Sequence, residues 1–180
     1  MAAHSSPSAV SAASGALALR PVVDWSAAVW AGIGSGLVFL ILALAWVPAQ
    51  VGGNAWVITR LMSSPVLGED ILAPPATFDL TATLVGWTLH FVACFLFALA
   101  IAYVLHRGGL ITGIVGGALA GAGLYGIVFY TATLAFPWFF AHRSVPMLLT
   151  HIAYGAVAGG IYELLEVEAF EQVDAEGGAG

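Results

Sequence analysis

Charged residues are scarce in this chain, and lysine is absent. They make up 8% of 180 residues, against roughly 25% in an ordinary soluble domain. No basic patch could neutralise phosphates, so the composition argues against nucleic-acid binding. The single cysteine, Cys94, excludes an internal disulfide and a cysteine-rich metal site. Nucleophile motifs of hydrolases are also missing, so we expect a protein that is not an enzyme.

Apolar residues, by contrast, account for 61% of the chain. A hydrocarbon core about 30 Å thick needs about 20 apolar residues in a helix that crosses it. Four stretches satisfy this requirement, at about residues 25–47, 78–105, 110–136 and 146–165. The sequence therefore predicts an all-α integral membrane protein, built as a four-transmembrane-helix bundle in residues 25–165.

The first loop and the two chain ends are more polar than these spans. In the loop, Asn54 can cap a short amphipathic helix, which we expect to lie at the membrane interface. The polar face of this helix consists of Thr59, Arg60, Ser63 and Ser64. Residues 1–24 are predicted to be a disordered N-terminal tail, and residues 166–180 an acidic C-terminal tail. The second span can begin near Phe78, and the first is expected to stop at Pro48.

The lipid bilayer is the predicted partner of the four spans. Arginines in the short loops, which would set orientation, are divided equally between the two sides. We expect both termini in the cytoplasm, because the long first loop is polar and the chain begins without an apolar signal-peptide core. A homo-oligomer or a partner within a membrane complex is also compatible with the sequence.

Small residues recur at four-residue spacing in three of the spans. This spacing lets helix backbones approach closely in lipid, where no hydrophobic force drives helices together. The expected helix-packing positions are Gly32, Gly36, Gly113, Gly117, Gly121, Gly155 and Gly159. The third span could use its glycine face within the chain or against a second copy.

Rare polar residues inside the spans mark the candidate site, because hydrocarbon cannot solvate them. Asp79, Thr83 and His90 lie at i, i+4 and i+11, which places them along one stripe of the second span. His151 begins a similar stripe in the fourth span. Tyr130, in the third span, is expected to come near enough to hydrogen-bond a histidine.

Three hypotheses follow for this interior stripe. The polar side chains could be structural, fixing helix register through buried hydrogen bonds. They could form a minor ion or proton path, as in a small transporter or a transporter-like subunit. Alternatively, His90 and His151 could bind haem b or share a metal ion in a membrane redox subunit. Two histidines in four spans do not decide between them.

Several short motifs resemble a family of small, uncharacterised four-span bacterial membrane proteins. They are residues 74–79 (PPATFD), 89–91 (LHF), 126–130 (GIVFY), 136–139 (FPWF) and 151–155 (HIAYG). The resemblance covers roughly residues 29–163 and implies the bacterial inner membrane as the location. Some members carry the label "sodium:proline symporter", although symporters of that name have ten or more spans and this chain has four. Asp79, His90, Tyr130 and His151 match the family motifs, which imply no catalytic role for them.

Overall fold

Four long helices form the body of the molecule in the computed structural model, which describes residues 17–106, 108–167 and 169–174. The candidate membrane-spanning segments are Trp25–Val51, Leu80–Leu105, Gly109–Leu134 and Val145–Leu165. Each is long and apolar enough to cross a membrane. The predicted four-helix architecture is therefore confirmed at the level of helix number, length and apolarity.

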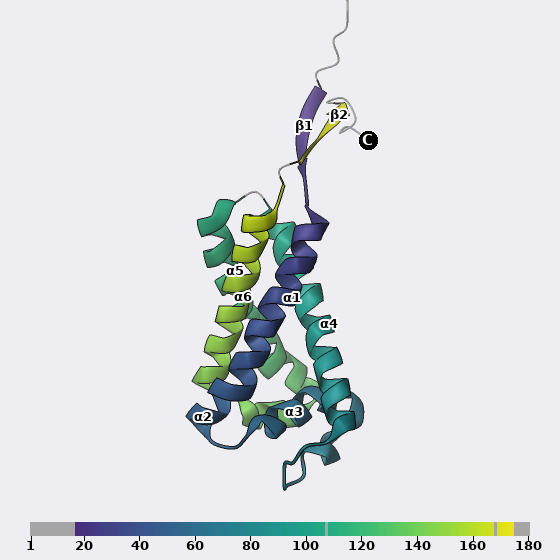
Figure 1. The fold of residues 1–180 in the computed structure, drawn as a ribbon, viewed down its shortest axis with the longest axis vertical. Coiled ribbons are helices and arrows are strands. Elements are labelled where there is room, and N and C mark those ends of the chain that lie inside the picture. Colours follow the sequence, from purple (N-terminus) through teal and green to yellow (C-terminus); the bar gives the residue numbers. More distant parts are fainter. Residues whose placement is uncertain (1–16, 107, 168, 175–180) are drawn as a thin grey trace, which may run out of the picture.

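Two of the helices are central and two are peripheral (Figure 1). Half of the most apolar window of α1 (Trp25–Ile41) and of α6 (Val145–Leu165) is buried, against 28% for α4 (Leu80–Leu105) and α5 (Gly109–Gly126). Helix α5 packs along the length of α6, and α4 packs on α1, whereas α4 touches α5 little. The bundle is therefore least tightly closed between α4 and α5.

Side-chain caps fix where four of the helices begin, with Asp24 as the cap of α1. The Asn54 side chain accepts hydrogen bonds from the Trp56 and Val57 N–H groups, which starts α3 (Ala55–Leu67) as predicted. Asp79 does the same for α4 through the Ala82 N–H. The second span consequently begins at Leu80, two residues later than Phe78. Ser144 caps α6.

The first span does not stop at Pro48, as the sequence suggested. A π-helical turn, η1 (Leu42–Trp46), follows α1, and α2 (Val47–Val51) continues the helix beyond the proline. The Val47 N–H bonds to the Leu42 carbonyl, five residues back. Pro48 then occupies the first turn of α2, where its missing N–H costs no helical hydrogen bond. A second π turn, η3 (Ile127–Thr131), follows α5.

Helix α3 lies across one end of the bundle and packs on α4 (Figure 1). Thr59, Ser63 and Ser64, which the amphipathic pattern placed on the polar face, are buried there. Gly86 of α4 makes this approach possible, since a Cβ at that position would lie 2.7 Å from the Thr59 carbonyl oxygen. Each of these hydroxyls donates a hydrogen bond to a backbone carbonyl within α3, so burial leaves none of the three donors unpaired.

The segment between α3 and α4 is a loop with short turns. It contains the 3-10 turn η2 (Glu69–Leu72) and is held by Arg60. The Arg60 guanidinium donates to the carbonyls of Ile71, Ala73 and Thr77 at 3.1–3.3 Å. The 3-10 turns η4 (Ala132–Leu134) and η5 (Pro137–His142) lead from η3 to α6, and Trp138 of η5 donates to the Ser64 hydroxyl at 2.8 Å.

Both segments predicted as tails contain a strand. β1 (Leu17–Val22) and β2 (Ala169–Asp174) pair antiparallel and project from the end of the bundle opposite α3 (Figure 1). The neighbouring ends of α1 and α6 bring the two segments together, so pairing requires little loop closure. The remaining tail residues, 1–16 and 175–180, lie outside the described residues.

Asp24 joins the α1 and α6 ends beneath this strand pair. Its carboxylate accepts from Ser26 and Ala27, which caps α1, and also from the Val167 N–H at 3.1 Å. The Asp24 N–H in turn donates to the Tyr162 hydroxyl. Hydrogen bonds from Ala27 and Val167 lower the pKa of the Asp24 carboxyl below its usual range.

Glycines account for the closest helix contact, which is within the chain. Gly117 and Gly121 of α5 lie directly against the backbone of α6, where a Cβ would overlap the carbonyls of Gly155 and His151. Gly113 lies similarly against Gly159. On the other side of the bundle, Gly32 and Gly36 of α1 lie against α4.

Candidate functional site

A cavity of about 350 Å³ lies inside the bundle, between its middle and the α3 end. Its lining is almost entirely apolar and comes from every long helix, from α3 and from η3 and η5. The lining residues are Phe39, Ile58, Leu61, Met62, Pro65, Leu89, His90, Ala93, Cys94, Phe97, Leu124, Val128, Phe129, Ala132, Phe136, Phe139, Met147, His151 and Tyr154. For comparison, an apolar protein cavity of about 150 Å³ suffices to bind benzene.

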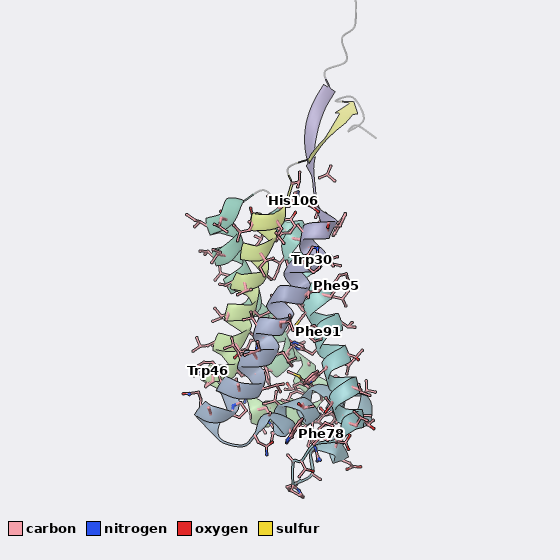
Figure 2. All side chains as sticks on the ribbon, viewed as in Figure 1. Trp30, Trp46, Phe78, Phe91, Phe95 and His106 are labelled. Carbon is pink, nitrogen blue, oxygen red and sulfur yellow. The ribbon has the colours of Figure 1, made fainter. Side chains whose placement is uncertain are left out.

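The cavity opens between α4 and α5, which are neighbours in the bundle but touch each other little. Ala93 on the α4 side is exposed, and Val128 and Ala132 on the other side are half-buried. Small side chains therefore stand at its mouth. Phe91 and Phe95 of α4, labelled in Figure 2, do not line this cavity and lie instead on the side of α4 that packs against Gly36 and Gly32 of α1. A molecule dissolved in lipid would reach the cavity directly from the side.

His90 is buried in the wall and is held by one strong hydrogen bond. Its Nε2–H donates to the Gly36 carbonyl of α1 at 2.9 Å, which ties α4 to α1. The Cys94 sulfur lies against the ring, 3.6 Å from Nε2 and 3.8 Å from Nδ1. The Phe39 ring packs on the imidazole with centroids 5.0 Å apart. This geometry is that of a structural hydrogen bond between helices.

His151 faces the same cavity from α6 but retains one free nitrogen. Its Nδ1–H donates to the Met147 carbonyl of its own helix at 2.8 Å. Within the described part of the chain, Nε2 accepts no hydrogen bond, although the side chain is only 4% exposed. Phe39, Tyr125 and Phe129 surround the ring edge to face, at centroid distances of 4.7, 5.5 and 5.8 Å.

The other three candidate residues do not join the histidines. Asp79 caps α4, about 16 Å along the helix axis from His90. The Thr83 hydroxyl donates to the Asp79 carbonyl at 2.7 Å. Tyr130 is 59% exposed, and its ring contacts the Arg143 guanidinium at 4.7 Å rather than a histidine. The stripe predicted on α4 is therefore divided between a helix cap and the cavity wall.

Haem or a shared metal does not fit the two histidines as they lie. An axial or metal-bound histidine needs a free ring nitrogen directed at the metal. The Nε2 of His90 is not free, since it donates to the Gly36 carbonyl, and the Cys94 sulfur lies against the same ring at 3.6 Å from Nε2 and 3.8 Å from Nδ1. Among the residues that the structure describes, no group of three or more His, Cys, Asp and Glu side chains is placed to hold a metal ion.

Sequence reasoning missed most of the residues that shape the cavity. Phe39 contacts both histidines, and Trp138 of η5 bonds to Ser64 of α3. In the sequence, neither residue can be distinguished from the chain's many other aromatic residues. Arg60 was interpreted only as part of a polar helix face. Its usable signal was the long loop that follows it, which leaves many carbonyls in need of donors.

Comparison with family models, curated proteins and solved structures finds no match for this chain. Function is therefore argued from the cavity itself.

Proposed function

We propose that the chain is a non-enzymatic multi-pass membrane protein whose interior cavity binds a small, mainly apolar molecule taken from the lipid. One observation carries this proposal, namely an apolar cavity of about 350 Å³ lined by His151, whose Nε2 has no hydrogen-bond partner among the described residues. Ligand sites are characteristically apolar clefts with a few convergent polar groups. An ion path is less well supported, because no Asp, Glu, Lys or Arg lines the cavity.

The location is proposed from the resemblance described above and from the four apolar helices. We place the protein in the bacterial inner membrane with both termini in the cytoplasm. The apolar outer faces of α4 and α5 would contact lipid, as their exposed Val104, Leu119 and Ile111 side chains suggest.

Direct binding to the purified protein tests the proposal. The protein in lipid nanodiscs is titrated with radiolabelled 4-pentylphenol, and empty nanodiscs supply the partition background. We expect one saturable site per chain. Ala93→Trp places an indole at the cavity mouth and should weaken binding by about tenfold or more, equivalent to losing roughly 1.4 kcal/mol.

Leu84→Trp is the matched control, since Leu84 lies on the same helix, 61% exposed and away from the cavity. It should leave the affinity unchanged. Binding that never saturates above the partition background, or that Ala93→Trp leaves intact, would contradict a ligand site in this cavity.

A further inference from the structure

The hydrogen-bonding character of the cavity follows from the positions of its hydrogens. A carbonyl oxygen only accepts, so the His151 nitrogen that meets the Met147 carbonyl must carry the hydrogen. A cationic ring in this apolar wall would be costly, because three aromatic rings and no carboxylate surround it. The ring is therefore neutral, and its Nε2 presents a lone pair.

The other polar groups of the lining have already used their donors. The His90 Nε2–H is bound to the Gly36 carbonyl, and the Tyr154 hydroxyl donates to the Cys94 carbonyl at 2.6 Å. The Cys94 thiol faces His90. The Met147 thioether can only accept. The lining thus offers hydrogen-bond acceptors and no strong free donor.

We infer that the ligand is an apolar molecule carrying one O–H or N–H donor, which it gives to His151 Nε2. This inference rests on the proposed function and specifies its ligand class, that of alkylphenols and long-chain alcohols. An ether, ketone or quinone of the same shape brings a second acceptor. Such a molecule leaves Nε2 unpaired and loses its own hydrogen bond to water without replacement.

The test compares 4-pentylphenol with its methyl ether, 4-pentylanisole, in the same nanodisc binding assay. The ether carries a methyl group in place of the hydroxyl hydrogen, so its oxygen can accept a hydrogen bond but cannot donate one. We expect the wild-type protein to bind the phenol about tenfold more tightly than the ether after correction for partitioning. His151→Phe, which keeps an aromatic ring but removes the acceptor, should abolish this preference while the ether still binds.

His106→Phe is the control, because His106 is a half-buried histidine at the far end of α4, away from the cavity. It should keep the preference for the phenol. A second measurement needs no variant, since a ring-fluorinated 4-pentylphenol is a stronger donor and should bind the wild-type protein more tightly still. This comparison remains available if His151→Phe does not fold.

Equal affinity for phenol and ether in the wild-type protein, with both sensitive to Ala93→Trp, would overturn the donor requirement and leave the proposed site standing. A preference that persists in His151→Phe would overturn the role of His151. Absence of saturable binding by either compound would overturn the proposed function and the inference together.

Discussion

Two buried histidines face one cavity and differ in what their ring nitrogens bond to. The His90 Nε2–H donates to the Gly36 carbonyl of another helix, so this side chain holds α4 and α1 together. The His151 Nδ1–H donates to the Met147 carbonyl of its own helix, and Nε2 faces the cavity. His90 therefore stabilises the bundle, whereas His151, in our proposal, recognises the ligand.

His90→Phe should reduce stability and affect binding little. The phenyl ring keeps the packing on Phe39 but cannot donate to Gly36, and a hydrogen bond between membrane helices contributes about 1 kcal/mol. The loss is measured by denaturant titration in mixed micelles. His90→Gln retains an N–H donor and should recover part of it. Wild-type stability in His90→Phe would show that the Gly36 bond contributes nothing.

Both histidines could be identified from the sequence because hydrocarbon cannot solvate them. The sequence could not show, however, whether a polar residue near the start of a span caps the helix or lies inside the bundle. Asp79 shares the helical stripe of His90, yet a difference of two residues in where α4 begins converts it into the N-cap. Phe39 could not be predicted as the residue that contacts both imidazoles, since its position depends on how α1 crosses α4 and α6.

The α5 and α6 helices pack through glycine backbones, and this contact has no room for a side chain. Gly155→Ala would drive its methyl group into the Gly117 carbonyl, which cannot rotate away. We expect a loss of about 3 kcal/mol, at the upper end of overpacking effects. Unfolding of the purified protein in micelles measures it.

Gly123→Ala is the control for this substitution, because nothing lies within 4 Å of a Cβ at that position of α5. Alanine is the better helix former, so this variant should be neutral or slightly stabilised. If both alanines had the same effect, close backbone approach would not be what holds α5 to α6.

The Asp24 connection between α1 and α6 should give stability a dependence on acid pH. Because the folded state lowers the pKa of this carboxyl, its contribution is complete above the unfolded pKa. This contribution is lost as the pH falls below about 4 and then through the pKa that the Asp24 carboxyl has in the folded state. Asp24→Asn keeps a capping side chain but does not titrate, so its stability should fall less than that of the wild type between pH 7 and pH 3.

Glu69→Gln, which changes an exposed carboxylate at the opposite end of the bundle, is the charge-matched control. Thermal unfolding at each pH supplies the comparison. If Asp24→Asn and the wild type lose stability in parallel on acidification, the carboxylate is not what couples the two helix ends.

Helix number and approximate bounds followed from the length of the apolar runs alone, since a span must bury its backbone polar groups in its own hydrogen bonds. The two π turns and the strand pair could not be predicted from the length of the apolar runs. A π turn depends on how one helix fits its neighbours, and the pairing of β1 with β2 depends on α1 and α6 ending side by side.

At the scale of the whole molecule, the described residues hold an even number of candidate spans, so Val22 and Val167, which flank these spans, should lie on one side of the membrane. In a Cys94→Ala background, single cysteines at Val22 and Val167 should react with an impermeant maleimide from the same side. A cysteine at Glu69, beyond α3, should react from the other side. Labelling of Val22 and Val167 from opposite sides would contradict four spans.

The bundle is closed by glycine contacts on one side and left open between α4 and α5 on the other. Photolabelling locates a ligand in that opening most directly, using 4-pentylphenol with a diazirine in its alkyl chain. We predict labelling of residues 89–97 and 124–132 that excess unlabelled phenol prevents. Label spread over lipid-facing positions such as Leu84, Val104 and Leu119, unchanged by competitor, would contradict a binding cavity in this protein.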